Sequence, residues 1–318
     1  MKAMQIHTLG KPMELVDITR PNPAKGEVLV RVHACGINFG DTLIVDGKYQ
    51  EKFALPFTPG MEICGTVEAL GEGVVSPAVG TRVGAYGGIG GLAEYTCIEA
   101  ARCVAVPGAM PHAEVAAFLV AYGTSHLALE RAELQKGETL LVLGAAGGVG
   151  LTAVELGKHM GAKVIAVARS AEKLAICEAA GADHLINSET DDIRAIVKTL
   201  GGADVVYDPV GGDQFKAALR ACNPLARILP LGFASGDIPQ IPANILLVKN
   251  ITVIGYYWGG YTVFAPEKLT ESFKALFEIY QTGALKPHIS HTVPLAQANE
   301  ALALLKDRKS TGKVVVTL

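Results

Sequence analysis

Short segments in which apolar and polar residues alternate occupy the first hundred or so residues of the chain. They run through 4–8, 14–18, 28–34, 63–70, 82–85, 93–98 and 103–106, and Pro or Gly residues separate them. Alternation with a period of two is typical of strands that bury one face, and turn residues at regular intervals favour a closed or two-layered β structure. We therefore predict a small β-barrel or sandwich for this part of the chain.

The pattern changes after Pro111. Residues 114–134 have the periodicity of a helix, and six apolar segments then alternate with helical ones as far as Tyr257. The predicted strands are 140–143, 163–168, 184–186, 205–207, 228–231 and 251–254. Strands that alternate with helices indicate an α/β fold with a doubly wound parallel sheet, which binds its ligand where the strand order reverses.

The residues after Trp258 fit neither part as a self-contained domain. They comprise a helical segment at 266–280, a strand at 288–293, a short helix at 295–305 and a final strand at 312–318. We expect them to return to the N-terminal domain. The predicted domains are therefore 1–117 together with 259–318, and 118–258, with a cleft between them.

Composition and charge narrow the class of protein. Half of the 318 residues are apolar, and the formal net charge of −3 is spread without runs of one sign, so neither nucleic acid nor an anionic membrane is expected as a partner. No apolar stretch approaches membrane-spanning length, and the first residues open a strand instead of a signal peptide, so we expect a cytoplasmic protein. The six cysteines form no C-x-x-C pair, which indicates reduced thiols.

One segment predicts a specific chemistry. Residues 140–150, LLVLGAAGGVG, lead from an apolar strand directly into closely spaced small residues. Ala145 and Gly147 allow a sharp turn and a close approach to phosphates, and Gly150 allows the next helix to pack on its strand. Free N–H groups at the helix start then favour a dinucleotide pyrophosphate. A tight turn without a ligand is the alternative, but the strand at 163–168 completes a βαβ unit and favours the nucleotide.

The end of that second strand indicates which nucleotide is bound. An NAD site has Asp or Glu about twenty residues beyond the glycines, whereas this chain has Arg169 and Ser170, followed by Lys173. Two cations and a hydroxyl match a 2′-phosphate, so NADPH is the predicted cofactor. The alternative is that Arg169 and Lys173 are ordinary solvated charges.

Further motifs are spread over almost the whole chain. They are GEVLVRV at 26–32, GINFGD at 36–41, PGME at 59–62, YGT at 122–124, DPVGG at 208–212, GFASG at 232–236 and TGKVV at 311–315. With these motifs the sequence resembles the medium-chain dehydrogenase/reductase superfamily and, within it, the zinc-free NADPH:quinone oxidoreductase (zeta-crystallin-like) family. The resemblance implies a Rossmann NADPH-binding domain and a discontinuous GroES-like β-barrel domain that holds the substrate.

Zinc-dependent relatives have a Cys and a His where this chain has Asn38 and Met61. An amide and a thioether do not replace a thiolate and an imidazole around zinc, and segment 79–101 lacks the clustered cysteines of a structural zinc lobe. A different metal site could be imagined from three other residues, but we expect these to be buried structural residues: His33, Cys35 and Cys64. Without a Lewis acid, we expect hydride transfer from NADPH to an acceptor that is already electrophilic, a quinone or a similar conjugated carbonyl compound.

The resemblance implies three catalytic residues, Asn38, Asp41 and Tyr49. The Asn38 amide or the Tyr49 hydroxyl is predicted to polarise the acceptor oxygen. Two structural alternatives stay open: Asp41 as the cap of a helix that starts at Thr42, and Tyr49 as an exposed aromatic residue of a loop. No residue is a compelling general acid, so solvent or the ribose hydroxyl is expected to supply the proton.

The resemblance also implies a set of cofactor contacts. They are Thr124 near the nicotinamide; Ala146, Gly147, Gly148 and Val149 at the pyrophosphate; Arg169, Ser170 and Lys173 at the 2′-phosphate; and Gly232, Phe233, Ala234 and the segment from Tyr256 to Trp258. Ser188 stands where many relatives have an aromatic or basic residue against the adenosine phosphate, which predicts a weaker preference for NADPH. Trp258 is either an aromatic wall for a flat substrate or a packing residue at a domain junction or dimer interface.

Three functions are open at this point. The first is an NADPH-dependent quinone reductase, and the second is a reductase of enones, 2-alkenals or enoyl thioesters with the same hydride chemistry. The third is a non-catalytic NADPH-binding sensor or structural protein. A homodimer is also predicted, because the apolar strand at 251–254 would expose unpaired groups at the sheet edge unless a second subunit covered it.

Overall fold

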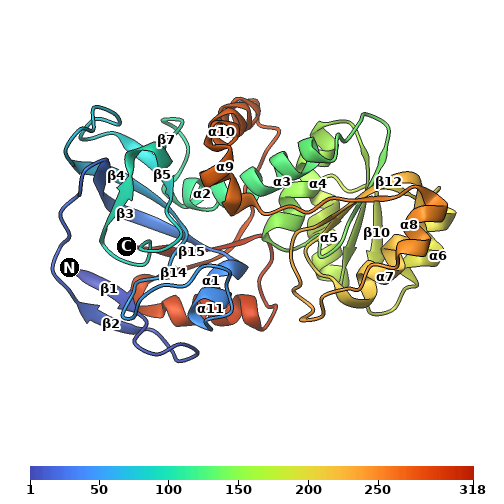
Figure 1. The fold of residues 1–318 in the computed structure, drawn as a ribbon, viewed down its shortest axis with the longest axis horizontal. Coiled ribbons are helices and arrows are strands. Elements are labelled where there is room, and N and C mark those ends of the chain that lie inside the picture. The colour runs from blue at the N-terminus through green and yellow to red at the C-terminus, as the bar shows by residue number, and fades with distance from the viewer. The chain divides into compact units, whose positions relative to one another are not determined.

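The computed structural model describes residues 1–318, and the chain divides into two compact units. The first unit comprises 1–120 and 287–318, and the second unit comprises 121–286 (Figure 1). The first unit is therefore discontinuous in sequence, as the order of the predicted elements suggested. The second unit is a single insertion into it.

The second boundary between the units differs from the prediction. The prediction ended the nucleotide-binding domain at Trp258, whereas α10 (Pro266–Gln281) still belongs to the second unit. Helix α10 buries Phe273, whose ring lies edge-on to the Trp258 indole at 6.3 Å between centroids. His126 of the same unit also contacts α10, because its Nδ1 lies 3.0 Å from the Ser272 hydroxyl. These contacts hold the helix in the second unit.

The first unit is built on a seven-stranded sheet with the order β14-β15-β3-β4-β5-β7, in which β6 also pairs with β3. Every pairing in this sheet is antiparallel except that of β14 with β15. The strands are β3 (Glu27–Ile37), β4 (Glu62–Leu70), β5 (Arg82–Tyr86), β6 (Tyr95–Glu99), β7 (Cys103–Ala105), β14 (Ile289–Pro294) and β15 (Lys313–Thr317). A separate two-stranded sheet contains β1 (Lys2–Gln5) and β2 (Glu14–Asp17).

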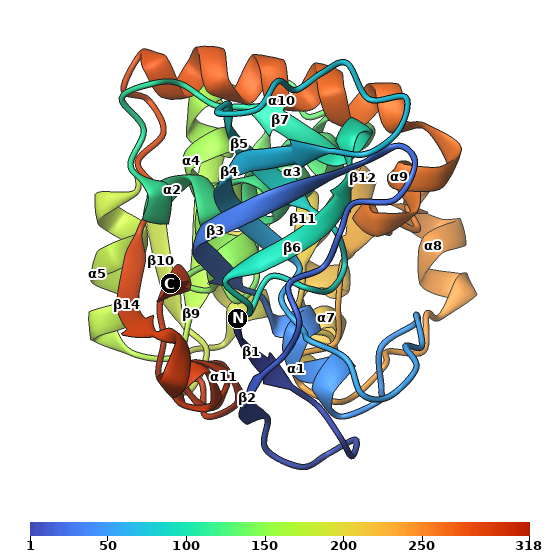
Figure 2. The ribbon, with the colours of Figure 1, turned by 90° about the vertical axis from the view of Figure 1, so that its left-hand side faces the viewer.

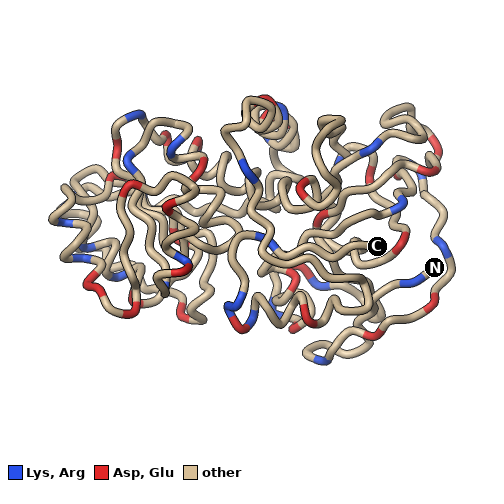
Figure 3. Tube along the Cα trace, turned by 180° about the vertical axis from the view of Figure 1, so that it is seen from behind, with Lys and Arg blue, Asp and Glu red and all other residues tan.

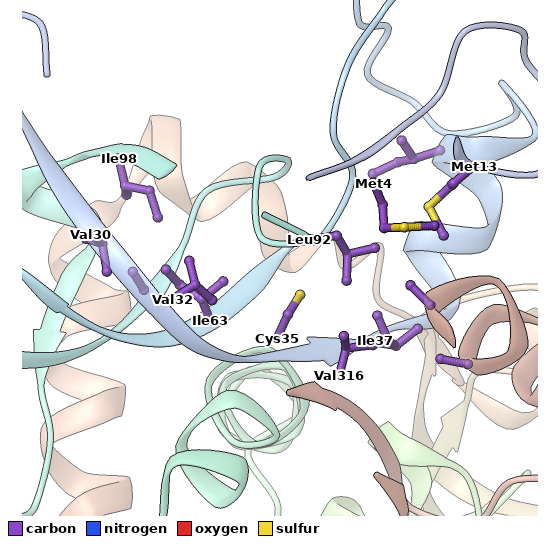
Figure 4. Packing of buried hydrophobic residues seen from close by; sticks show 14 of the residues in the cluster. Met4, Met13, Val30, Val32, Cys35, Ile37, Ile63, Leu92, Ile98 and Val316 are labelled. Atoms are coloured by element: carbon purple, nitrogen blue, oxygen red, sulfur yellow. The ribbon is translucent and has the colours of Figure 1, made fainter. Parts of the chain in front are cut away.

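Strand β3 organises this unit because it is eleven residues long and pairs with three other strands (Figure 2). Its register with β4 shifts at two places, and such bulges bend a strand and increase its twist. Val30 and Val32 of β3 are buried, whereas Arg31 between them is exposed, which is the predicted alternation. Figure 4 shows these valines and Cys35 in the core together with Ile63 of β4.

The second unit contains a six-stranded parallel sheet with the order β10-β9-β8-β11-β12-β13. The strands are β8 (Thr139–Val142), β9 (Lys163–Ala168), β10 (His184–Asn187), β11 (Ala203–Asp208), β12 (Cys222–Pro230) and β13 (Thr252–Val253). The first three strands extend the sheet in one direction and the next three in the other, so the order reverses between β8 and β11. This is the strand order of a dinucleotide-binding fold, and it confirms the predicted α/β class.

Helices cover both faces of this sheet. Leu141 and Ile165 share a buried cluster with α6 and α7, while Leu140 on the opposite face meets α4 at Gly157. The helices of the second unit are α3 (Leu119–Arg131, which begins in the first unit), α4 (Gly148–His159), α5 (Ala171–Ala179), α6 (Ile193–Thr199), α7 (Gly212–Ala221), α8 (Ala243–Lys249), α9 (Tyr261–Phe264) and α10. Those of the first unit are α1 (Phe39–Val45), α2 (His112–Ala116) and α11 (Ala298–Lys306).

The carboxylate of Glu155 in α4 is hydrogen-bonded to residues near both ends of the second unit. Glu155 accepts a short hydrogen bond from the Tyr122 hydroxyl through one oxygen and a 3.2 Å bond from the Lys286 backbone N–H through the other. Burial raises the pKa of Glu155 to about 7, because the charged form loses its hydration. Tyr122 and Lys286 lie at the beginning and the end of the inserted unit.

Acidic and basic side chains are interspersed along the whole chain, and neither sign forms a continuous run (Figure 3). The net charge is correspondingly small, at −3. None of the helices combines the length and the apolar character that crossing a membrane requires. All six cysteines are free thiols.

Candidate active site

The glycine-rich loop joins β8 to α4 at the centre of the parallel sheet. Gly144 has φ +58°, a left-handed conformation that favours glycine. A Cβ atom on Gly150 would lie 2.3 Å from the Gly144 carbonyl oxygen and 2.8 Å from the Ala145 Cα atom, so only glycine fits there. A Cβ atom on Gly147 would come no closer than 3.3 Å to any atom outside its immediate neighbours. The loop therefore excludes a side chain at Gly150, whereas at Gly147 a Cβ atom would make one tight contact, with the Gly144 carbonyl oxygen.

The Gly147 side of the loop is suited to an anion. Gly147 is the N-cap residue of α4, and no side chain caps this helix. Helix α4 begins at Gly148, and its first N–H groups, among them those of Gly148 and Val149, have no hydrogen-bond partners within the helix itself. They also lie at the positive end of its dipole. The structure thus provides uncapped donors beside a backbone surface that carries no side chain.

Strands β9 and β10 bring a second group of predicted residues together. Ser188 follows β10, and its N–H donates to the carbonyl oxygen of Ala168 at 2.9 Å, which places it beside the end of β9. Arg169 and Ser170 follow directly after β9. Ser170 is the N-cap of α5, and its hydroxyl accepts a 3.3 Å bond from the Lys173 N–H. Arg169 makes no ion pair within the protein, so its charge is available to a ligand.

The loops after β11 and β12 also meet at the carboxyl edge of the sheet. The Ala234 N–H donates to the Pro209 carbonyl oxygen at 3.1 Å, which joins the segment that begins at Gly232 to the loop after β11. Asp208, the last residue of β11, fixes the loop after this strand, because one of its carboxylate oxygens accepts hydrogen bonds of 2.7 and 2.9 Å from the N–H groups of Val210 and Gly211. Phe233, which lies between Gly232 and Ala234 in the segment after β12, is partly exposed.

The predicted residues near the nicotinamide have different environments. The Tyr256 hydroxyl donates to the Thr124 carbonyl oxygen at 3.0 Å, and burial holds the Tyr256 pKa well above its usual range. Trp258 is buried and packs on Phe273, and a Cβ atom on Gly123 would lie 3.1 Å from its indole nitrogen. Trp258 therefore packs on residues of the second unit, and its two predicted roles, an aromatic wall for the substrate or packing at a domain junction or dimer interface, stay predictions.

In the first unit, Asn38 and Asp41 begin helix α1. The helix starts at Phe39, three residues earlier than the predicted start at Thr42, and Asn38 is its N-cap. Asp41 is thus the third helical residue and not the predicted N-cap, although its carboxylate accepts a 2.8 Å bond from the Asn38 backbone N–H and so takes part in a capping box. Burial raises the pKa of Asp41 to about 7.

The Asn38 side chain belongs to a buried charged network. Its Oδ1 accepts from the Lys313 ammonium at 2.6 Å, and its Nδ2 donates to Glu62 Oε1 at 2.9 Å. Lys313 and Glu62 are themselves 2.5 Å apart, with side chains 5% and 0% exposed. Neither residue was predicted to belong to the site, although Glu62 ends the PGME motif at 59–62 and Lys313 lies in the TGKVV motif at 311–315.

Tyr49 lies close to the same end of the barrel. A Cβ atom on Gly40 would lie 2.9 Å from the Met61 sulfur and 3.4 Å from a ring carbon of Tyr49, so both side chains approach the first turn of α1. Tyr49 is half-buried and packs against the core of the first unit. Tyr49 is therefore not fully exposed to solvent, in contrast to the interpretation of this residue as an exposed aromatic side chain of a loop.

Comparisons with known proteins identify the family. Residues 24–108 match the alcohol dehydrogenase GroES-like domain, and residues 148–278 match a family described as zinc-binding dehydrogenase. A quinone oxidoreductase-like protein 2 homolog from Nematostella vectensis is 43% identical over 99% of this chain and 88% of that protein. The Bos taurus quinone oxidoreductase-like protein 2 is 40% identical over 98% of this chain and 90% of that protein.

The Escherichia coli quinone oxidoreductase, solved as a complex with NADPH, superposes with a TM-score of 0.93 at 30% identity over the full length of both chains. The chain belongs to the quinone oxidoreductase family of medium-chain dehydrogenases/reductases. A family member from Thermus thermophilus, also described in complex with NADPH, has a TM-score of 0.87 at 34% identity over both full chains.

In this quinone oxidoreductase family member, the predicted residues divide between the units. The second unit gathers most of the predicted cofactor residues at the carboxyl edge of its sheet. The first unit gathers the predicted catalytic residues at the start of α1. Lys313 and Glu62 are the two additional residues that the structure connects to this second group.

Proposed function

We propose that the protein is a zinc-independent reductase that transfers hydride from NADPH to a quinone or a similar conjugated carbonyl acceptor. Its membership of the quinone oxidoreductase family supports an oxidoreductase of the medium-chain type. Two solved relatives are described as complexes with NADPH. The choice of a quinone or conjugated carbonyl compound as acceptor is argued from the residues of the first unit.

The residues of the second unit fit NADPH. The uncapped N-terminus of α4, with no side chain at Gly147, would hold the pyrophosphate. Arg169 and Ser170, with Ser188 beside them, would hold the 2′-phosphate, because a guanidinium and hydroxyl groups can pair with it. When bound there, NADPH supplies a hydride from its nicotinamide ring. The protein's task is then to orient both reactants and to keep water away from them.

The observation that carries the acceptor proposal is the ammonium group of Lys313, 2.6 Å from the Asn38 oxygen. Asn38 and Met61 stand where zinc-dependent relatives have ligands, and a buried cation at this point opposes a divalent metal ion. Glu62, the carboxylate that accepts a hydrogen bond from the Asn38 amide, is already paired with Lys313. No group of three His, Cys, Asp or Glu side chains in the chain is arranged to hold a metal ion. The residues therefore do not fit zinc.

Without a metal, polarisation of the acceptor falls to side-chain donors. The Asn38 amide and the Tyr49 hydroxyl are the candidates, because an oxygen that gains negative charge during the reaction is stabilised by an oriented N–H or O–H. A quinone or conjugated carbonyl already draws electrons towards its oxygen, so such donors suffice. Oxidation of an alcohol would need the stronger activation that zinc provides.

We also propose a homodimer. Strand β13 ends the parallel sheet, and helix α8 beside it in sequence exposes Leu247 and Val248 to more than three-quarters of their full extent. An unpaired edge together with exposed apolar side chains is stabilised by pairing with a second subunit. Sedimentation or light scattering would give the mass in solution, and a monomer would exclude this part of the proposal.

A steady-state screen tests the proposed function. Benzoquinone, naphthoquinone, 2-alkenals and an enoyl thioester are each tested with NADPH and NADH, in the presence and absence of a metal chelator. We expect quinone reduction that prefers NADPH and is unchanged by the chelator. Turnover of alkenals or thioesters alone would replace the quinone by the second substrate class. Tight NADPH binding with no reduction of any acceptor would indicate a non-catalytic protein.

A further inference from the structure

We propose that Lys313 and Glu62 are positioning residues that lock the orientation of the Asn38 side-chain amide, so that its N–H and not its C=O faces the acceptor. The inference rests on the proposed function, in which Asn38 is one of two candidate donors, and it selects Asn38. It also assigns a task to two buried charged residues that no other contact of the site explains.

The sheet of the first unit brings the three residues to one edge. Strands β15, β3 and β4 are neighbours and run antiparallel, so the start of β15, the end of β3 and the start of β4 coincide. Lys313 is the first residue of β15 and Glu62 is the first of β4. Asn38 follows the last residue of β3 directly. Lys313 and Glu62 are 251 positions apart in sequence, and strand pairing alone brings them together.

The chemistry of the two partners leaves the amide one orientation. An ammonium group only donates hydrogen bonds, and an ionised carboxylate only accepts them. The atom 2.6 Å from Lys313 Nζ must therefore be the Asn38 oxygen, and the atom 2.9 Å from Glu62 must be the nitrogen. Both bonds are charge-assisted and are stronger than bonds between neutral groups. Flipping the amide would place N–H against N–H at Lys313 and oxygen against oxygen at Glu62.

The partners are themselves held in place. The second oxygen of Glu62 accepts a 2.9 Å bond from the Val120 backbone N–H. Both charged side chains are almost completely buried, so neither can turn outwards to water without leaving the other as an unpaired buried charge. On the other side, the Asn38 backbone N–H donates to Asp41. The amide is thus fixed through its backbone and through both ends of its side chain.

One amide hydrogen remains for a ligand. Nδ2 carries two hydrogens, and the one that does not go to Glu62 has only a 3.4 Å contact with the Gly36 carbonyl oxygen. At this distance a hydrogen bond is weak. Asn38 is half-buried, in contrast to its two partners, so its side chain is the accessible part of the network. A flipped amide would instead turn its oxygen towards an acceptor oxygen that gains negative charge, which would repel it.

A set of four proteins tests this inference: wild type, Lys313→Met, Glu62→Gln and the double variant. Each single variant leaves one buried charge unpaired and is expected to be strongly destabilised. The double variant removes both charges, so its Tm is expected to stay close to that of wild type. It also removes both constraints on the Asn38 amide. Methionine has no donor group to hold the amide oxygen, and glutamine can pair with either end of the amide because it both donates and accepts hydrogen bonds.

We expect the double variant to bind NADPH with unchanged Kd, because the nucleotide residues lie in the second unit, and to lose at least about tenfold in kcat/KM for benzoquinone. Lys158→Met is the matched control, since Lys158 pairs with Asp183 at 2.7 Å but has no contact with Asn38. It should leave kcat/KM unchanged. A double variant that folds, binds NADPH and retains wild-type kcat/KM would show that the ion pair is only structural, and would overturn the inference.

A second measurement does not depend on turnover. The Asn38 side-chain NH2 signals in a ¹⁵N spectrum are assigned by their absence in Asn38→Asp. In wild type we expect two well-separated hydrogens that exchange slowly with water, and in the double variant at least about tenfold faster exchange. Equal exchange in both proteins would refute the lock. If wild type reduced no acceptor, the proposed function would fail, and this spectrum would still decide whether Lys313 and Glu62 orient the amide.

Discussion

Two glycines of the same loop should respond differently to the addition of one methyl group. Gly150 has no room for a Cβ atom, which would lie 2.3 Å from the Gly144 carbonyl oxygen. Only a shift of backbone against backbone relieves such a contact, and overpacking of this kind costs about 1–3 kcal/mol. For a domain of the size of the second unit, this corresponds to a fall in Tm of roughly 2–12 °C. Gly150→Ala should therefore lose both stability and NADPH affinity.

Gly147→Ala should separate these two properties. The Gly147 backbone is extended, with φ −79° and ψ 175°, and an added Cβ atom would meet nothing closer than 3.3 Å. Replacing glycine by alanine in a compatible conformation stabilises a protein by about 0.4–1 kcal/mol, but the 3.3 Å contact with the Gly144 carbonyl oxygen requires a small backbone adjustment that offsets this gain, so the Tm should change little. The methyl group would however occupy space that the pyrophosphate needs. We expect an NADPH Kd at least about tenfold higher, which corresponds to about 1.4 kcal/mol.

The assay combines thermal unfolding without ligand and fluorescence titration with NADPH for each variant. Gly108→Ala is the control, because its added Cβ atom would meet nothing within 4 Å and the residue lies in the other unit. It should change neither quantity. Wild-type NADPH affinity in Gly147→Ala would refute the placement of the pyrophosphate at this loop. An unchanged Tm in Gly150→Ala would refute the close packing of α4 on β8.

Three further predictions concern charge and surface. Arg169→Ala should raise the Kd of NADPH about tenfold or more and leave that of NADH unchanged in fluorescence titrations, and an equal effect on both would argue against a 2′-phosphate contact. The raised pKa of Glu155 stabilises the folded state at low pH, and this contribution is lost as pH rises through about 7. The Tm of wild type relative to Glu155→Gln should therefore fall between about pH 5 and about pH 8 in thermal scans, and a constant difference would contradict the shift. Replacing Leu247 and Val248 by Glu should halve the mass measured by light scattering, and a mutant of undiminished mass would exclude this surface from the dimer interface.

The nucleotide-binding half of the chain was predictable because its signals are local. Strands such as 163–168 are continuous apolar runs, and in the structure β9 occupies these residues. The glycines and the cationic residues that follow β9 lie next to these strands in sequence. Since parallel strands end at one edge of the sheet, a correct order of strands already gathers the residues that follow them. The sequence therefore predicted which residues of this unit lie together.

The network around Asn38 could not be predicted in this way. Lys313 stands at the start of an apolar strand and Glu62 at the start of another, and a charge at a strand end is ordinarily a solvated one. Only the pairing of β15 and β4 with β3 buries them together. Helix α10 was predicted to belong to the first unit for a related reason. Its amphipathic sequence shows that one face is buried, but it does not show which unit that face packs against.

The bonds that Glu155 makes with Tyr122 and Lys286 have a consequence for how the gene can be rearranged. Because both termini of the inserted segment contact one side chain, they lie near each other, and this proximity is what allows one domain to be spliced into or out of another. A short linker from Val120 to Pro287 would thus span a small gap and leave the barrel as a continuous chain. The excised segment would keep the six-stranded parallel sheet and the glycine-rich loop within one chain.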